Sequence, residues 1–412
     1  MKIMFLVHQF YPEFQSGTEK FVFNNALMAQ TSGHKVKVVT YSFYDDSFYD
    51  HYDDGIFSKE FFYQGIPVLA FKYKDPQFDL HLALENNILS NFAKKIYQIE
   101  TPDIIHAGHS MRVHEFIRVA IREKIPYVLT LTDFFLICPK VILAPKNNSL
   151  CSGPQKGAAC HVLCGEFSDG FIGKRLNIAR DILLNAKQIV SPSKFVARIF
   201  TQEVNELDIK IIGHGIRYNH IKENKRIYQG GEKLIFGYAG TIAYHKGVHV
   251  LVEAFNGIDN ENAELKIFGS GEERYIKSLK EIAGKSKKVS FCGTFSSEQV
   301  GEVLNGLDVL VIPSVCYESY SLILHEALAS NVPTIVSALG GMLEKINDGI
   351  NGFTFEPGSS ADLFKKIKLI LANPQILNEL KQNITKMMVV PTVEQEAYKY
   401  NAIYSRNVVN GG

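Results

Sequence analysis

Short apolar runs alternate with amphipathic stretches along most of the chain, and this alternation limits the possible folds more than any other feature. Runs such as Ile3–Val7 and Tyr127–Leu131 are apolar throughout, which is typical of strands that are buried on both faces. The stretches between them, such as Glu19–Gln30, have the apolar spacing of helices. Strands that are separated by helices form parallel sheets that helices cover on both sides. We therefore predict an α/β fold.

The alternation is interrupted at residues 217–233, which are polar and charged, show no clear period and resemble a linker. It restarts at Leu234–Ala239 and continues in the same pattern. A chain of 412 residues is long enough for two or three domains. We therefore predict two facing, Rossmann-like domains with doubly wound parallel sheets, at residues 1–215 and 216–390.

The end of the chain has a different character. Residues 393–404 carry enough alanine, isoleucine and tyrosine to dock onto another surface. We predict that a C-terminal helix within residues 391–412 crosses back to the first domain. The last residues, 408–412, are expected to form a loose tail.

Composition and charge point away from two classes of protein. The chain has 44 Lys and Arg against 43 Asp and Glu, so nothing indicates a nucleic-acid partner. No apolar run approaches the roughly 18 residues of a membrane span, and Lys2–Val7 is too short for the core of a signal peptide. We expect a cytoplasmic protein, and the composition leaves peripheral association with the inner face of a membrane open.

The most informative segment is Pro313–Leu328, which follows an apolar strand and opens a short helix with Ser321 as the expected N-cap. Treated as one helix, Glu318 and Glu326 differ by roughly 80° in direction and ~12 Å in height. That separation exceeds the ~5–10 Å of a catalytic carboxylate pair. It suits the two ends of an elongated ligand whose anionic middle meets the helix N-terminus, such as a nucleotide sugar. A capped surface helix with solvated glutamates explains the same local pattern.

Glycine or polar residues also follow the predicted strands of the first half, where ligands of open α/β sheets bind. Gly17 precedes a helix, and His106, His109 and Asp133 come at strand ends. Asp133 could accept hydrogen bonds from sugar hydroxyls, and the histidines could contact a substrate. An ordinary turn and structural histidines are the alternative interpretation.

In the second half, the segment Gly237–Gly247 ends a strand with a glycine turn and places Lys246 just before a helix. A lysine there can neutralise part of a diphosphate. Gly269 and Gly271 end the next strand and would give a nucleobase or ribose close access to the backbone. A plain glycine turn is the alternative.

Four of the six cysteines fall within 27 residues of one another, in an insertion at about 138–164. Four thiolates suffice for a closed, structural zinc site, although the spacing matches no common zinc finger. Free thiols and a disulfide are the alternatives, and the disulfide is the weaker one in a chain without a secretion signal. The candidate ligands are Cys138, Cys151, Cys160 and Cys164.

Together these segments resemble the retaining glycosyltransferases of family 4 (group 1), a large family with the GT-B fold that includes sucrose-phosphate synthases and bacterial mannosyltransferases. The resemblance covers nearly the whole chain and is strongest in its second half. The segments that carry it there are Gly240–Gly247, Phe268–Gly271, Leu307–Ala329 with the spacing of Glu318 and Glu326, and Asn351–Phe353. In the first half they are Gly17, Asp103–His109, Thr130–Asp133 and Ser191–Ser193.

The resemblance implies retaining transfer of a sugar from a nucleoside-diphosphate donor to an acceptor hydroxyl, with no cofactor required for catalysis. The acceptor would be a glycan, a lipid-linked molecule or a small molecule, in the synthesis of cell-surface polysaccharide or another glycoconjugate. Glu318 would contact the donor sugar near the reacting centre, Lys246 the diphosphate, and His109 or His106 the transferred sugar. The implied donor-binding residues are Gly17, Asp133, Thr241, Lys246, Gly269, Gly271, Ser319, Tyr320, Ser321, Leu322 and Glu326.

The chain departs from the family pattern in two places that bear on function. Thr241 stands where the family often has an arginine that contacts phosphate. The histidine segment is one residue longer than the usual His-x-His, so it does not identify which of its two histidines contacts the sugar. A non-catalytic nucleotide-sugar-binding protein or partner subunit is therefore the alternative function.

Overall fold

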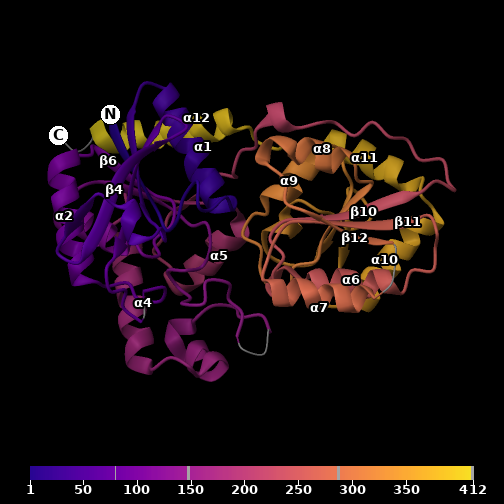
Figure 1. The fold of residues 1–412 in the computed structure, drawn as a ribbon, viewed down its shortest axis with the longest axis horizontal. Helices are drawn as coiled ribbons and strands as arrows, with labels where there is room; N and C mark the ends of the chain where they lie inside the picture. Colours follow the sequence, from indigo (N-terminus) through magenta and orange to yellow (C-terminus); the bar gives the residue numbers. More distant parts are fainter. Residues whose placement is uncertain (79, 146–148, 285–287, 410–412) are drawn as a thin grey trace. The chain divides into compact units, whose positions relative to one another are not determined.

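The computed structural model describes residues 1–78, 80–145, 149–284 and 288–409 (Figure 1). The chain forms two α/β units, each built on a mainly parallel sheet, which confirms the predicted fold class. Unit 1 comprises Met1–Gly215 and Val393–Gly412, and unit 2 comprises Ile216–Thr392. Part of the predicted tail, residues 410–412, lies outside the described residues.

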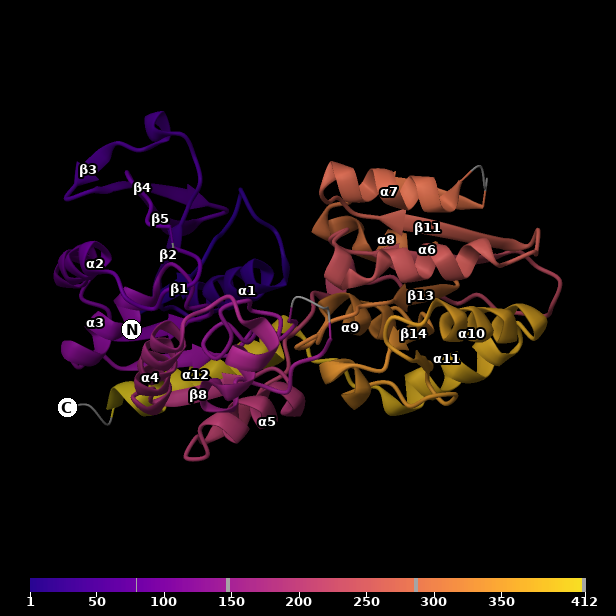
Figure 2. The same cartoon turned by 90° about the horizontal axis from the view of Figure 1, so that it is seen from below.

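Unit 1 contains a nine-stranded sheet in the order β3-β4-β5-β2-β1-β6-β7-β8-β9 (Figures 1 and 2). Seven strands, β1, β2 and β5 to β9, run parallel, because crossover connections join each to the next. Most apolar side chains of these strands are buried, as the continuous apolar runs predicted, but β9 at the sheet edge leaves Ile211 39% exposed. The strands are β1 Lys2–Val7, β2 Lys35–Tyr41, β3 His51–Asp53, β4 Ile56–Tyr63, β5 Ile66–Tyr73, β6 Ile104–Ala107, β7 Tyr127–Thr130, β8 Gln188–Ser191 and β9 Ile209–Ile211.

The sequence analysis did not predict strands β3 and β4, which extend one end of this sheet (Figure 2). They pair antiparallel with each other, and β4 pairs antiparallel with β5. Most side chains of β4 are at least partly exposed, so its sequence lacks the continuous apolar run of the buried strands. Residues 51–63, which are rich in tyrosine, phenylalanine and aspartate, therefore form a hairpin at the sheet edge.

Helices α1 and α12 cover one face of the unit 1 sheet. Side chains of β1, including Phe5, share a core with Phe21 of α1 and Tyr400 of α12, and both views show α12 beside α1. No helix within the described residues, α12 included, has the length and apolar character that a membrane span requires. The helices of this unit are α1 Gly17–Thr31, α2 Asn87–Glu100, α3 His114–Arg122, α4 Asp169–Leu184, α5 Lys194–Glu203 and α12 Val393–Val409.

Unit 2 contains a six-stranded, fully parallel sheet in the order β12-β11-β10-β13-β14-β15. Figure 1 shows α6, α7 and α10 on one face of this sheet and α8, α9 and α11 on the other. The strands are β10 Leu234–Ala239, β11 Ala263–Phe268, β12 Val289–Gly293, β13 Val309–Ile312, β14 Thr334–Ser337 and β15 Phe353–Phe355. The helices are α6 Val248–Asn256, α7 Glu273–Ala283, α8 Val300–Asn305, α9 Leu322–Ala329, α10 Ser360–Ala372 and α11 Ile376–Met387.

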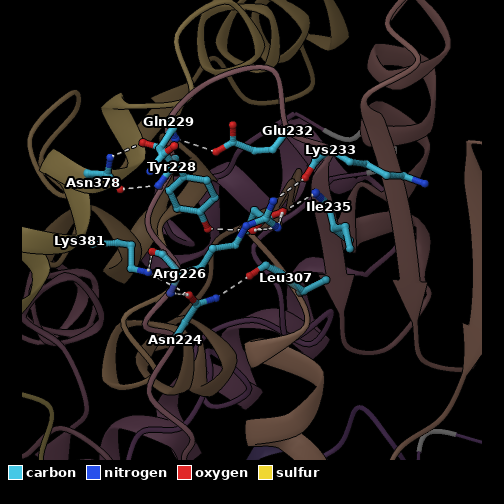
Figure 3. Close-up of polar contacts among 11 residues, drawn as sticks. Asn224, Arg226, Tyr228, Gln229, Glu232, Lys233, Ile235, Leu307, Asn378 and Lys381 are labelled. Atoms are coloured by element: carbon cyan, nitrogen blue, oxygen red, sulfur yellow. Dashed lines mark hydrogen bonds and ion pairs between the residues drawn. The ribbon is translucent and has the colours of Figure 1, made fainter.

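Residues 217–233 do not form the free linker that their polar sequence indicated. Arg226 contacts the buried Asp308 through NH1, at 2.8 and 2.9 Å from the two carboxylate oxygens, and Tyr228 donates to the same carboxylate at 2.8 Å (Figure 3). Lys381 of α11 donates to Asn224 at 2.9 Å. Hydrogen bonds therefore hold this segment at the amino ends of the unit 2 strands, where it completes the core of unit 2.

Candidate functional site

The candidate site of unit 2 is built from loops at the carboxyl ends of β10, β11, β13 and β14. Two glycines with positive φ allow these loops to touch. At Gly247 (φ +69°) a Cβ would lie 1.8 Å from the carbonyl oxygen of Pro313. At Gly340 (φ +60°) it would lie 2.5 Å from the carbonyl oxygen of Glu318, which also accepts the N–H of Gly341 at 2.8 Å. A side chain at either glycine would force the loops apart.

Lys246 and Glu318 form the centre of this site. The Lys246 Nζ donates to Glu318 Oε1 at 2.7 Å, and the Ser314 hydroxyl donates to the same oxygen at 2.6 Å. The Lys246 and Glu318 side chains are 30% and 12% exposed, so a ligand can reach both. The pair thus ties the loop after β10 to the loop after β13. Ser314 is an unpredicted member, although its place just after a strand could have identified it.

Both members of the pair are held in their charged forms. Burial raises the pKa of Glu318, but Lys246, followed by Ser314, lowers it more, so its net pKa is lowered. Burial lowers the pKa of Lys246, but Glu318 raises it more, so its net pKa is raised. Glu318 is therefore a carboxylate at neutral pH and can accept hydrogen bonds rather than supply a proton.

Helix α9 begins directly after this pair at an unusual turn. Ser321 is the N-cap residue, as predicted, but its φ is +59° and its side chain makes no capping hydrogen bond. Its carbonyl instead accepts the Nδ1 proton of His325 at 2.9 Å, and the His325 ring stacks on Tyr320 at 3.8 Å. A positive φ is costly for a residue with a Cβ, so these contacts fix the turn. Because α9 begins at Leu322, the backbone N–H groups of its first turn are the ones that could bind an anion at this helix N-terminus.

The two glutamates belong to different elements, which corrects the geometry expected from the sequence. Glu326 lies inside α9 and is 5% exposed, whereas Glu318 lies in the loop before Leu322, the first helical residue. The expected separation of roughly 80° and ~12 Å assumed a helix from residue 318, and that assumption is wrong because α9 begins at Leu322.

The remaining predicted donor residues of unit 2 lie along the same sheet edge. Thr241 is exposed in the loop after β10. Gly269 and Gly271 flank Ser270, whose carbonyl accepts the N–H of Ile242 at 2.8 Å, so the β11 loop packs on the β10 loop. Contact with a donor stays a prediction for these residues, and for Lys246, Ser319, Tyr320, Ser321, Leu322 and Glu326.

Unit 1 has its own cluster of ionisable side chains at the carboxyl ends of β1, β6 and β7. The Nδ1 of His109 accepts the backbone N–H of Met111 at 3.1 Å, so its Nε2 carries the proton and donates to Asp133. The ring of His8 stacks on His109 at 3.9 Å, and its Nε2 lies 3.7 Å from a Glu19 oxygen. His109 and Asp133, both predicted, are therefore neighbours in one chain of polar groups.

His8 and Glu19 are the members of this cluster that the sequence analysis missed. His8 directly follows β1, and the Ser-x-x-Glu pattern of Ser16 and Glu19 is a capping box, so both signals were present. The N–H of Ser16 donates to Glu19 at 2.7 Å. Burial raises the pKa of Glu19, and burial, followed by an electrostatic interaction with the neighbouring His109, lowers the pKa of His8 well below its usual range. Gly17, predicted to approach a ligand, is exposed as the first residue of α1.

The structure places His106 in the core of unit 1 and not at an accessible edge. Its Nδ1 lies 2.6 Å from the Tyr404 hydroxyl and its Nε2 lies 2.8 Å from the Thr130 hydroxyl. Its side chain is fully buried, and burial lowers its pKa to about 3. The expectation that His106 contacts a substrate is corrected for this reason. His109 lies just beyond the strand, but its side chain is only 2% exposed, so its contact with a substrate stays a prediction.

The four clustered cysteines lie around one cavity of unit 1. Cys138, Cys151 and Cys160 are buried, Cys164 is half-buried, and all four line the cavity. Burial, followed by the three other thiols, raises the pKa of Cys160 to about 12. As the side chains are placed, no group of three or more Cys, His, Asp or Glu in the described part of the chain could hold a metal ion.

The sequence of this chain is similar to that of known glycosyltransferases. Residues 220–387, which lie in unit 2, match the family described as "Glycosyl transferases group 1". An uncharacterized glycosyltransferase of Methanocaldococcus jannaschii is 32% identical over 162 residues, which are 38% of this chain and 41% of that protein. The lipopolysaccharide 1,2-N-acetylglucosaminetransferase of Salmonella typhimurium is 23% identical over 46% of this chain and 55% of its own length. The matches thus span about half the length of these relatives or less.

Solved structures resemble the whole chain. The structure of HepE from Anabaena in complex with UDP has a TM-score of 0.70 and 17% sequence identity, and the match covers 98% of this chain and 100% of that one. At this identity the likeness concerns the fold. The two parallel-sheet α/β units therefore have the architecture of the GT-B glycosyltransferase structures.

Proposed function

We propose that this chain is a retaining glycosyltransferase of family 4, which moves a sugar from a nucleoside-diphosphate donor to an acceptor hydroxyl. The observation that carries the proposal is the Lys246–Glu318 pair, held between the β10 and β13 loops just before the N-terminus of α9. The match of residues 220–387 to group 1 glycosyltransferases supports it, because that segment contains this site.

The pair suits two adjacent parts of one donor. An ammonium group has three N–H donors, and Glu318 takes one of those of Lys246, so two can bind diphosphate oxygens. The bonds from Lys246 and Ser314 both end on Oε1 of Glu318, so its Oε2 is placed to accept a sugar hydroxyl. The first-turn amides of α9 would bind the same diphosphate, and Glu326, further along the helix, would bind the ribose hydroxyls.

The proposed reaction needs no pair of catalytic carboxylates. The bond between the anomeric carbon and the β-phosphate oxygen breaks, and the bond to the acceptor oxygen forms on the same face of the sugar. The acceptor proton passes to the leaving diphosphate, whose growing negative charge Lys246 and α9 stabilise. Glu318 remains ionised throughout, in keeping with its lowered pKa.

Unit 1 also has groups that suit the recognition of sugar hydroxyls. The bond from Met111 sets the tautomer of His109, and the bond between His109 and Asp133 fixes the orientation of both side chains. Such an arrangement suits the recognition of hydroxyls. We propose a glycan, lipid-linked or small-molecule acceptor in the synthesis of a cell-surface glycoconjugate, on the cytoplasmic side of the membrane. The similarity to a lipopolysaccharide glycosyltransferase supports this assignment.

The test begins with donor binding. A panel of UDP-, GDP- and ADP-sugars should contain at least one compound that raises the melting temperature. At 100 times its Kd, this compound should raise the unfolding free energy by about 2.7 kcal/mol. That donor should then be consumed with an acceptor, and the anomeric coupling in the product should show retention. Binding without turnover across acceptors would indicate a non-catalytic nucleotide-sugar binder, and an inverted product would refute the retaining mechanism.

A further inference from the structure

Four cysteines that the proposed sugar transfer does not use converge on one cavity in unit 1. They come from three places in the chain: the turn after β7, a following loop, and a single helical turn. The other residues that line this cavity are mostly apolar or proline. The cysteines are Cys138, Cys151, Cys160 and Cys164.

Backbone hydrogen bonds bring these cysteines to the same cavity. Cys160 and Cys164 are the two ends of a five-residue π-helical turn, and the N–H of Gly165 closes it on the Cys160 carbonyl at 3.1 Å. Residues spaced by four on a helical turn point to one side, with roughly 5–6 Å between their Cβ atoms. The N–H of Cys138 donates to Phe134 at 2.8 Å, and that of Cys151 donates to Leu143 at 2.9 Å. Two pairs of cysteines, Cys138 with Cys151 and Cys160 with Cys164, thus line the same cavity.

Two charged side chains hold the walls of the cavity. Glu203 of α5 accepts the backbone N–H groups of Gln155 at 2.8 Å and Lys156 at 3.1 Å, in the loop between Cys151 and Cys160. Arg175 of α4 is buried, donates to the carbonyls of Phe135 and Leu136, and interacts electrostatically with Cys138 and Cys160. A buried guanidinium next to thiols offsets negative charge at this place.

We propose that Cys138, Cys151, Cys160 and Cys164 bind one zinc ion as a closed, structural site. Each thiol would lose its proton to solvent and form one Zn–S bond of about 2.3 Å in a tetrahedral arrangement. The resulting group carries two negative charges, which Arg175 and nearby Lys140 offset in part. Cys138, Cys151 and Cys160 are free thiols in this structure, so no disulfide among them competes for these sulfurs.

The sulfurs are gathered but not yet in metal-binding geometry, so binding must draw them together. That movement is ordinary, since a metal site rarely exists complete before the metal binds.

The zinc ion would fix the segment that carries a predicted substrate contact. Asp133 lies five residues before Cys138, and its Oδ1 accepts the N–H of Phe135 at 2.8 Å. The ring of Phe135 lies 5.6 Å from that of His109. A closed site with four protein ligands has no position for a substrate, so its role is to hold this loop in place.

The first experiment measures metal in the full-length, wild-type chain. The chain is purified under reducing conditions, stripped with a chelator and dialysed against a small excess of zinc, and zinc per chain is determined by mass spectrometry. We expect one zinc per chain. Replacement by Co²⁺ should give the intense thiolate-to-cobalt charge-transfer band and the visible bands of a tetrahedral, thiolate-rich site. A chain that retains no zinc, or a cobalt spectrum without thiolate bands, would overturn the proposal.

Single variants then assign the ligands. Cys151→Ser and Cys164→Ser should each weaken zinc binding at least about 100-fold, since loss of an outer-shell partner alone costs 10–100-fold. Cys292→Ser, an exposed cysteine of unit 2, is the matched control and should bind zinc as the wild type does. Limited proteolysis within residues 138–164 should become faster when zinc is removed. Unchanged zinc affinity in both cluster variants, or disulfides in the reduced wild-type chain, would refute this ligand set.

Discussion

Lys246 and Glu318 are opposite charges that are largely removed from water, and each keeps the other ionised. The net pKa of Glu318 is lowered, so the stability that the pair contributes is fully present above the ordinary value of 4.5. It is lost as the pH falls through the lowered pKa of Glu318. The net pKa of Lys246 is raised above 10.5, so on the alkaline side the contribution is lost only as the pH rises through that raised value. The pair is therefore intact throughout the neutral range in which a donor would bind.

A double-mutant cycle of Lys246→Met and Glu318→Gln tests this coupling. Each single change leaves a partly buried charge without its partner, so the double variant should be more stable than the sum of the singles predicts by about 1–2 kcal/mol. Urea unfolding of the four proteins measures it. The same cycle on the exposed pair Lys222 and Glu302, whose atoms lie 3.5 Å apart, is the control and should give about 0–0.5 kcal/mol. Equal coupling in both pairs would contradict the assignment.

Gly247 tests the contact between the β10 and β13 loops. Gly247→Ala adds a methyl group that would lie 1.8 Å from a carbonyl oxygen, as well as strain from φ +69°. Gly349 has nearly the same φ, +73°, with open space around it, so Gly349→Ala carries the strain alone. We expect Gly349→Ala to cost about 1 kcal/mol and Gly247→Ala at least about 2 kcal/mol more. Urea midpoints compare them, and equal losses would show that the loops separate at no cost.

At the scale of elements, apolar runs predicted the parallel strands because burial on both faces leaves few other residues possible. The same rule located the site segments, which follow those strands. It failed for residues 217–233. The partners of Arg226 and Tyr228 lie about 80 to 150 residues away in the sequence, so no local pattern predicts these contacts. It also failed to separate His106 from His109. His106 lies within β6 and His109 just beyond it, but both side chains are buried, so position relative to the strand end does not show which one a ligand reaches.

Helix α12 is joined to the unit 1 sheet by buried hydroxyl groups as well as by apolar packing. The hydroxyls of Tyr404 and Tyr400 lie 2.6 Å from His106 and 2.9 Å from Thr130. Tyr404→Phe removes one hydroxyl and leaves the buried His106 nitrogen unpaired, so it should lower the unfolding free energy by about 1–3 kcal/mol. Tyr398→Phe on the same helix is the control, since Tyr398 is 77% exposed and should change stability little. If both variants unfold at the same urea concentration as the wild type, the hydroxyl network does not anchor α12.

At the scale of the whole molecule, the two units share an architecture, and both pair buried carboxylates with arginine. Unit 2 pairs Asp308 with Arg226, and unit 1 pairs Glu115 with Arg118. Unit 1 also buries His106 and His114, and burial lowers the pKa of each to about 3. A histidine that is neutral in the folded state but titrates near 6.5 when unfolded makes the fold sensitive to acid. Unit 1 should therefore lose stability as the pH falls from about 6.5 towards 3.

His114 allows this acid sensitivity to be tested away from both candidate sites. Its side chain is 2% exposed, and neither ring nitrogen makes a hydrogen bond within the described structure. Proton uptake by the unfolded state alone should cost the wild type about 2 kcal/mol at His114 between pH 7.5 and 5. His114→Leu removes the titrating group, so its unfolding free energy should fall by about 2 kcal/mol less over that range. His51→Gln, at an exposed position, should leave the wild-type fall unchanged. Urea unfolding at the two pH values decides the matter, because an identical fall in His114→Leu and wild type would mean that His114 does not stay neutral in the folded chain.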